Sequence, residues 1–202
     1  MVREVRKHFG VKRVGHAGTL DPFATGLLIV AVGREFTKTL GEMVNMEKEY
    51  IGEVCLGTQT DTYDVEGKIV DEKEFVHPTV EQVKRVLAEF KGEVLQVPPK
   101  YSAIKLKGVR AYKLSRRGED VELEPRIVRI SEIELLGMTE KGFRIRVVCG
   151  KGTYIRSLAN DIGIKLGMGA HLHCLIRTRI GHYTIEQSIT LEQLQQSISI
   201  DK

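Results

Sequence analysis

The spacing of apolar residues along the chain predicts short helices separated by strands. Apolar residues recur at helical spacing in four segments, and Gly10 and Gly167 directly follow two of them, as glycines often do at helix ends. Thr79 and Gln82 have the spacing of a capping box, which predicts a helix start at Thr79. The predicted helices cover residues 2–9, 79–90, 155–166 and a last short segment that begins at Thr190, with Gln193 in its first turn.

Strand-like segments fill much of the remaining chain. Two of them are joined by a short turn at residues 140–142, which is typical of a β-hairpin. Strands that are joined by hairpins and interrupted by helices favour an α+β fold, with a mainly antiparallel mixed sheet flanked by helices. The pattern leaves the order of the strands open. The predicted strands cover residues 26–33, 49–56, 126–136, 142–149 and 171–180.

Length and composition then limit the kind of protein. With 202 residues, of which 42% are hydrophobic and 29% charged, the chain can bury a core, and no repeat or linker divides it. We therefore expect a single domain over residues 1–202. No apolar run approaches the roughly 18 residues that cross a membrane, and the first residues are too charged for a signal peptide. We therefore expect a cytoplasmic protein. The odd number and wide spacing of Cys55, Cys149 and Cys174 favour reduced thiols. We also expect a monomer.

The charged residues are unevenly distributed. Residues 100–117 include seven lysines and arginines and no acid, whereas residues 47–74 carry nine acids and three lysines. Five further basic residues lie in 141–156, and residues 165–183 contain no acid. This segregation predicts a face that binds a polyanion, opposite a solvated acidic face. The alternative at this stage is that these charge runs have no functional meaning, since any soluble protein shows such runs.

The segment from Gly15 to Gly26 has neither the helical nor the strand period, and we expect a loop. Its three glycines permit tight turns, and Pro22 disfavours the helical conformation at Asp21. An ordered loop ahead of a buried strand can carry a functional carboxylate. An ordinary Asp-Pro turn would have the same sequence features, so both readings stay open on these grounds.

Five sequence blocks occur in the order that is known from one enzyme family. The first is the loop segment, which matches Gly-His-x-Gly-x-Leu-Asp-Pro-x-Ala-x-Gly at every defined position. The others are Lys48-Glu49-Tyr50 with Leu56-Gly57 and Thr60-Asp61-Thr62, then Val97 to Lys105, then Gly150 to Arg156 with Asp161, and finally Gly169 to Leu172 with Leu175-Ile176-Arg177. In these blocks the chain resembles the TruB family of tRNA pseudouridine synthases over nearly its whole length. The resemblance implies a pseudouridine-synthase fold with a central catalytic cleft, and isomerisation of a uridine in the T-loop of tRNA.

The resemblance also implies roles for individual residues. Asp21 would be the catalytic carboxylate that allows the glycosidic bond to break and the base to rejoin through carbon 5. Whether it attacks the sugar, attacks the base or assists elimination stays open. Arg156, in the first turn of a predicted helix, would pair with Asp21 through a bidentate contact. Tyr50 would stack on the flipped base, His16 would fill the position that the base leaves in the RNA, and Lys38 would contact a phosphate.

A basic stretch with interleaved tyrosines predicts a surface for phosphate contacts and base stacking. Two arginines of the late strand belong to the same face if that strand borders the cleft. We expect neither a metal nor an organic cofactor, because the cysteines lack zinc spacing and His171 and His173, on one face of a strand, have no further ligands nearby. The further predicted RNA-binding residues are Tyr101, Lys105, Lys107, Arg110, Arg116, Arg117, Arg177 and Arg179.

Two parts of the family pattern are absent from the sequence. Members usually begin with a strand and a Lys-Pro-x-Gly block ahead of the first helix, and many carry a C-terminal PUA-type RNA-binding domain. We therefore expect a shortened form that is less stable and less active than one extended at the N-terminus. Two alternative functions stay open: a tRNA-binding and tRNA-folding module of the same fold with weak catalysis, and an enzyme that acts on a small nucleotide.

Overall fold

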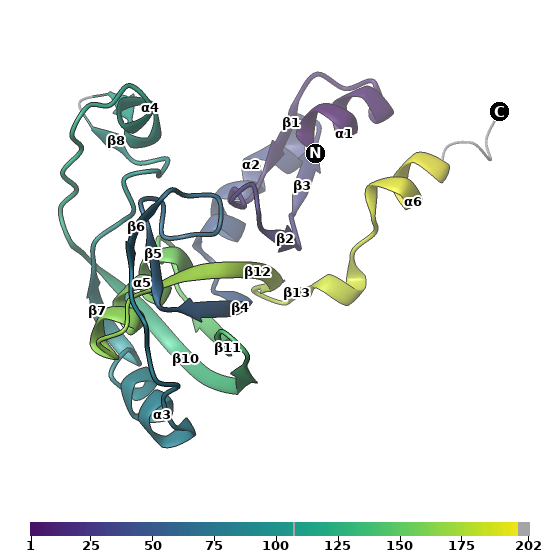
Figure 1. Ribbon diagram of the computed structural model, residues 1–202. Coiled ribbons are helices and arrows are strands. Elements are labelled where there is room, and N and C mark those ends of the chain that lie inside the picture. The colour runs from purple at the N-terminus through teal and green to yellow at the C-terminus, as the bar shows by residue number, and fades with distance from the viewer. Residues whose placement is uncertain (107, 198–202) are drawn as a thin grey trace.

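A seven-stranded sheet forms the centre of the protein in the computed structural model, which describes residues 1–106 and 108–197 (Figure 1). Its strands are β2 (Thr25–Gly26), β4 (Lys48–Leu56), β7 (Gly92–Gln96), β10 (Arg126–Thr139), β11 (Gly142–Cys149), β12 (Ala170–Ile180) and β13 (Tyr183–Thr184). The order β13-β12-β4-β11-β10-β7 is antiparallel throughout, while β2 pairs in parallel with β12. The sheet is therefore mixed and mainly antiparallel, as predicted.

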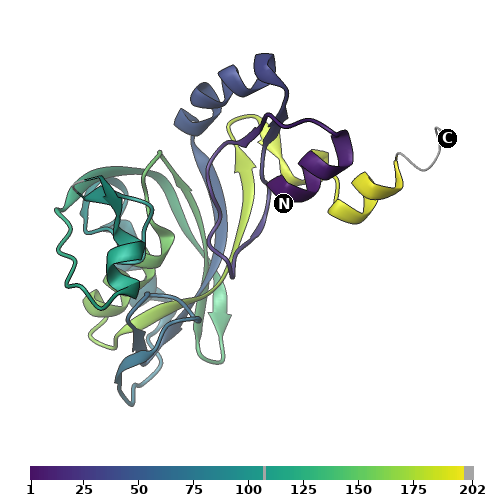
Figure 2. The same cartoon turned by 90° about the horizontal axis from the view of Figure 1, so that it is seen from above.

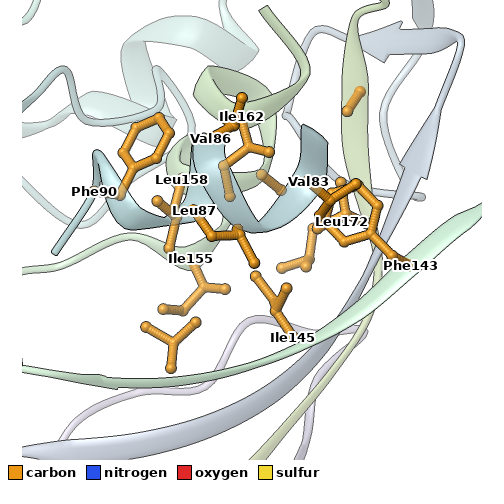
Figure 3. Close-up of a cluster of buried hydrophobic side chains, with 14 of the residues drawn as sticks. Val83, Val86, Leu87, Phe90, Phe143, Ile145, Ile155, Leu158, Ile162 and Leu172 are labelled. Carbon is orange, nitrogen blue, oxygen red and sulfur yellow. The ribbon is translucent and has the colours of Figure 1, made fainter. Parts of the chain in front are cut away.

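Two helices, α3 (Val80–Ala88) and α5 (Ile155–Lys165), cover one side of this sheet, here called the inner face (Figure 3). Thr79 and Gln82 form the predicted capping box at the start of α3, and Gly167 follows α5 with a φ of 76°. The main core lies between these helices and the strands. Its buried side chains include Val83, Leu87, Ile145, Leu158, Ile162 and Leu172.

The first quarter of the chain lies beside one end of the sheet (Figures 1 and 2). It consists of α1 (Val2–Phe9), the strands β1 (Val14–His16) and β3 (Val30–Val32), which pair with each other, and α2 (Arg34–Asn45). Helix α1 ends at Gly10 in the left-handed conformation, as predicted. Helix α2 was not predicted from the sequence. Its apolar residues Phe36, Leu40, Met43 and Val44 recur at helical spacing, so the sequence carried a signal for this helix that was missed. None of its residues is buried, and Phe36 and Val44 are exposed.

The predicted continuous strand over residues 26–33 is wrong. Thr25 and Gly26 pair with β12 of the main sheet, whereas Val30–Val32 pair with β1 in a separate two-stranded sheet. The apolar run therefore crosses from one sheet to the other, which its hydrophobicity could not reveal. The predicted loop is correspondingly shorter than the segment from Gly15 to Gly26, because β1 includes its first two residues and β2 its last two.

The remaining elements form a hairpin, an insert and the end of the chain. The strands β5 (Thr58–Thr60) and β6 (Ile69–Glu72) make one hairpin, and β8 (Lys105–Leu106), β9 (Val109–Arg110) and α4 (Ala111–Arg116) make an insert between β7 and β10. Ala111, Val121 and Leu123 give this insert a small core of its own. After the 3-10 turn Ile185–Gln187, helix α6 (Leu191–Gln196) begins with the predicted Thr190–Gln193 capping box. No helix in the described residues is long and apolar enough to span a membrane.

Candidate active site

The loop between β1 and β2 places Asp21 against the inner face of the sheet. Phe23 and Ala24 of the loop pack against the main core. The backbone N–H of Ala24 donates to the carbonyl oxygen of Asp21 at 3.0 Å, which closes a tight turn around Pro22. These contacts fix the backbone, while the side chain of Asp21 stays 33% exposed. The loop therefore presents an oriented carboxylate that a substrate can reach.

Arg156 forms the predicted bidentate pair with Asp21. Its Nε donates to Oδ2 and its Nη2 donates to Oδ1, both at 2.9 Å. The Arg156 side chain is only 4% exposed, which excludes a surface arginine at this position. Two parallel charge-assisted hydrogen bonds fix the plane of the carboxylate as well as its position. A guanidinium in the first turn of α5 therefore orients a carboxylate that lies 135 residues earlier in the chain.

Three more oxygens surround the Arg156 guanidinium. Its Nη1 donates to the carbonyl of Thr62 at 3.0 Å and lies 3.3 Å from Oδ2 of Asp64, and its Nη2 also donates to the carbonyl of Tyr101 at 3.1 Å. Asp64 is itself buried, and its Oδ1 accepts hydrogen bonds from the Thr62 hydroxyl and from the backbone N–H of Glu66. Each of the three guanidinium nitrogens of Arg156 thus has at least one hydrogen-bond acceptor.

The sequence analysis did not identify Asp64 as a site residue. The only signal was its place two residues after the Thr60-Asp61-Thr62 block. That signal is weak, because an aspartate in a hairpin turn is ordinarily solvated. Burial next to Arg156 is what distinguishes Asp64 from Asp61 in the same hairpin, and this follows only from the folded chain.

The α5 segment that carries Arg156 is fixed at its start by a buried amide. Gln96, 2% exposed at the end of β7, accepts from the backbone N–H of Tyr154 at 2.8 Å and donates to its carbonyl at 3.1 Å. The Ser157 hydroxyl donates to the carbonyl of Val97 at 2.8 Å. Both contacts join the end of β7 to the start of α5. The position of Arg156 therefore depends on Gln96 and on Val97, which begins the sequence block from Val97 to Lys105.

Tyr50 lies near the start of β4 on the inner face, where it packs against the main core. Burial raises the pKa of the Tyr50 phenol, and Cys149 contributes in the same direction, whereas the charge of Arg177 and a hydrogen bond with it lower that pKa. The Asp21 charge also acts on the phenol, which places both predicted catalytic residues in one electrostatic environment. Because the net shift is upward, Tyr50 is a neutral phenol at neutral pH.

The prediction that Arg177 and Arg179 share one RNA-facing surface is wrong. A β-bulge shifts the register between them, so that Arg177 lies opposite Tyr50 on the inner face and Arg179 lies opposite Glu49 on the other side. Arg177 is 1% exposed and donates to the carbonyls of Leu27 and Gly18. Its guanidinium is therefore bound to protein carbonyls and does not face the solvent.

The remaining predicted RNA-binding residues are distributed over three parts of the molecule. His16, in β1, is half-buried, and its buried Nδ1 has no hydrogen-bond partner among the described residues. Lys38 is exposed on α2. Tyr101 reaches the site through its carbonyl on Arg156. In the insert, Lys105, Arg110, Arg116 and Arg117 are exposed, and Lys107 lies outside the described residues.

The predicted separation of basic and acidic faces is wrong for residues 141–156. The side of the sheet away from α3 and α5, here called the outer face, carries Arg144, Arg146, Glu49 and Glu53. Arg144 lies 3.2 Å from Glu53, and Arg146 lies 2.8 Å from Glu49. Antiparallel pairing of β4 with β11 thus brings the basic run onto the acidic run, so these arginines are neutralised within the protein.

Neither histidine of the late strand belongs to a recognisable metal site. His171 is buried with its Nδ1 2.9 Å from the carbonyl of Thr58, whereas His173 lies at a bulge and is exposed. Over residues 1–106 and 108–197, no group of three His, Cys, Asp or Glu side chains is placed to bind a metal ion. A hollow of about 830 Å³ near His171, lined also by His77 and Glu140, includes none of Asp21, Tyr50 and Arg156.

Comparison with known proteins identifies a family from the sequence. A family model described as TruB family pseudouridylate synthase (N terminal domain) matches residues 6–155, and one described as tRNA pseudouridylate synthase B C-terminal domain matches residues 156–202. A tRNA pseudouridine synthase B from Protochlamydia amoebophila (strain UWE25) is 45% identical over 98% of this chain and 77% of its own length. The chain spans 65% of the length of a relative from Dehalococcoides mccartyi (strain CBDB1) and 79% of one from Desulfotalea psychrophila (strain LSv54 / DSM 12343).

Two solved structures resemble the fold. A Cbf5-Nop10-Gar1 complex matches with a TM-score of 0.76 and 30% identity over 98% of this chain. An H/ACA RNP bound to a substrate RNA containing 2'-deoxyuridine matches with a TM-score of 0.72 and 27% identity, also over 98% of this chain. The chain spans about half of each matched chain, 50% and 49%. Family models cover residues 6–202, and the Asp21 loop, the sheet and the Asp21–Arg156 pair occur together in one fold. The chain therefore belongs to the TruB family of pseudouridylate synthases.

Proposed function

We propose that this protein isomerises a uridine in the T-loop of tRNA to pseudouridine, with Asp21 as the catalytic carboxylate. The observation that carries the proposal is the two-bond pair between partly exposed Asp21 and buried Arg156. Family membership supports the reaction, and the relatives named tRNA pseudouridine synthase B support tRNA as the substrate. The fold of the H/ACA RNP bound to a substrate RNA supports an RNA partner.

The reaction requires one oriented carboxylate from the protein and little else. The glycosidic bond must break, the base must turn, and carbon 5 must join the sugar. A base inside a structured loop is out of reach, so the enzyme must flip it out of the stack. Asp21 then acts on the sugar or the base or assists elimination, while Arg156 keeps its carboxylate plane fixed. The neutral ring of Tyr50 offers a flat surface on which the flipped base can stack.

Positive residues on either side of the site would bind the RNA. We assign phosphate and loop contacts to His16 and Lys38 in the N-terminal part, to Tyr101 beside Arg156, and to the exposed basic side chains of the insert. Lys107 belongs to the same proposed set by sequence. Arg179 is left out of it, because it lies opposite Glu49 on the outer face and donates to the carbonyl of Gly181. We expect the protein to act as a monomer in the cytoplasm and without a metal or cofactor, since the reaction needs neither.

The proposal is tested by product formation on a T-arm stem-loop RNA, using carbodiimide labelling to detect pseudouridine. Asp21→Asn should lose pseudouridine formation while it keeps the melting temperature and RNA affinity of the wild type. Appreciable turnover by the purified Asn variant would show that Asp21 is not the catalytic carboxylate. RNA binding without any product from the wild-type chain would instead favour the tRNA-folding alternative, and reaction with free UMP would favour the small-nucleotide alternative.

A further inference from the structure

Arg177 connects the two ends of the Asp21 loop. Its Nε donates to the carbonyl of Leu27 at 2.8 Å, and its Nη2 donates to the carbonyl of Gly18 at 3.1 Å. One of these carbonyls lies before Asp21 in the chain and the other after it. The Arg177 side chain is 1% exposed and is among the largest fully buried side chains of the protein. A single buried guanidinium therefore spans the base of the loop that carries the carboxylate.

The backbone of Arg177 binds the same loop. Its carbonyl accepts a hydrogen bond from the backbone N–H of Leu27 at 2.8 Å, and Arg177 lies opposite Gly26 in the parallel β2–β12 pair. Gly26 has a φ of 104°, and a Cβ placed on it would lie 2.3 Å from the Arg177 carbonyl oxygen. The approach is thus closer than any other residue type would allow. The end of the loop has little freedom to move relative to β12.

The charge of Arg177 has an unusual environment for a buried cation. Among the described residues it has no carboxylate within ion-pair distance, although burying an unpaired charge is costly. The carbonyls of Leu27 and Gly18 in the loop are its hydrogen-bond partners. Tyr50 also lies directly opposite Arg177 across the β4–β12 pair. Arg177 thus binds the Asp21 loop through its guanidinium, and its strand position pairs with that of Tyr50.

From these contacts we propose that Arg177 is a positioning residue, which sets the Asp21 loop and Tyr50 in their mutual geometry. It acts through the loop carbonyls and makes no contact with RNA. This inference rests on the proposed function, because it assigns Arg177 a part in the reaction of Asp21. A lysine cannot replace it, since an ammonium group cannot span two carbonyls on either side of the loop as the planar fork does.

The test combines loop dynamics with kinetics on the full chain. Arg177→Lys and Arg177→Met are compared with Arg144→Lys, an exposed arginine on the outer face, and with Ile162→Val as a control for lost stability. Amide hydrogen exchange is measured for the peptide that includes Ala24 and Leu27, whose N–H groups are hydrogen-bonded at the loop. Single-turnover rate and Kd are measured with a T-arm stem-loop. If both Arg177 variants fold poorly, Gly26→Ala perturbs the same contact from the loop side.

For the Arg177 variants we expect exchange in the loop peptide to be about tenfold faster. We also expect a single-turnover rate that is lower by roughly ten- to a hundredfold at nearly unchanged Kd, as displacements of about 1 Å can cause. The two controls should change neither quantity. Unchanged loop exchange would overturn the inference, and so would a loss confined to Kd, which would make Arg177 an RNA contact. The wild type could also form no pseudouridine while the Arg177 variants still exchange faster in the loop. In that case Arg177 does position the loop, and the proposed function is rejected.

Discussion

The guanidinium Nη1 of Arg156 lies 3.3 Å from the carboxylate Oδ2 of Asp64, and this nitrogen makes no hydrogen bond to Asp21. The two carboxylates around Arg156 differ in access, because the Asp21 side chain is 33% exposed and that of Asp64 is 6% exposed. Only Asp21 can meet a substrate. If Asp21 gives up its charge in the proposed reaction, Arg156 keeps a buried counterion, and no unpaired cation is left at this site.

Replacing Asp64 by asparagine should destabilise the protein. The change removes the buried counterion of Arg156 but keeps a similar shape, and charged hydrogen bonds contribute about 1.5–3 kcal/mol each. We expect the free energy of unfolding to fall by about 1–3 kcal/mol in urea titrations. Asp61→Asn is the matched control, because Asp61 lies in the same hairpin and, among the described residues, its carboxylate accepts a hydrogen bond only from the backbone N–H of Lys68. An equal effect of both substitutions would mean that the contact with Arg156 contributes nothing measurable.

Replacing Arg156 by lysine should lower the rate of the chemical step without weakening RNA binding. A lysine keeps the charge but cannot make two parallel hydrogen bonds to Asp21. We expect a loss of roughly two orders of magnitude in single-turnover rate, the size associated with a misplaced catalytic group. Since Arg156 is 4% exposed, Kd for the stem-loop should stay within a factor of about two. A rate close to that of the wild type would show that the two parallel hydrogen bonds from Arg156 to Asp21 are dispensable.

Reversing three exposed charges of the insert should weaken RNA binding. We expect Arg110, Arg116 and Arg117 replaced by glutamate to raise Kd and to flatten its dependence on salt, with little change in melting temperature, because all three are exposed. If about four phosphates are contacted, a fourfold rise in salt should weaken the wild type by roughly two orders of magnitude. Reversal of Lys84, Arg85 and Lys91, exposed in and just after α3, is the control. Equal Kd values for both triple variants would make the insert an ordinary solvated surface.

The three cysteines should differ strongly in reactivity. Burial raises the pKa of the Cys149 thiol to about 12, and burial also raises the pKa of Cys55, whereas Cys174 is exposed. Because the thiolate is the reactive form, a thiol reagent at neutral pH should label Cys174 first, Cys55 slowly and Cys149 only after unfolding. Mass spectrometry of the labelled peptides over time gives the order. Early labelling of Cys149 in the native protein would contradict the burial on which this order depends.

Elements that depend on short-range sequence were predicted well. The capping boxes at Thr79 and Thr190 mark real helix starts, because each is formed by residues three positions apart. The left-handed Gly10 ends α1 for the same kind of local reason. The pairing of Asp21 with Arg156 was also predicted, but through resemblance to a family, since no local rule connects residues so far apart.

The sequence by itself determined the family, the class of fold and the pair of charged residues at the site. Only the tertiary structure decided which way the side chains of β12 point. Two bulges shift its register against β4, and one of them turns Arg177 toward Tyr50 and Arg179 toward Glu49. A bulge adds one residue and reverses the alternation beyond it, so the face of a side chain depends on the partner strand. For Arg177 that partner lies more than a hundred residues away, and it converts an expected surface arginine into a buried support of the Asp21 loop.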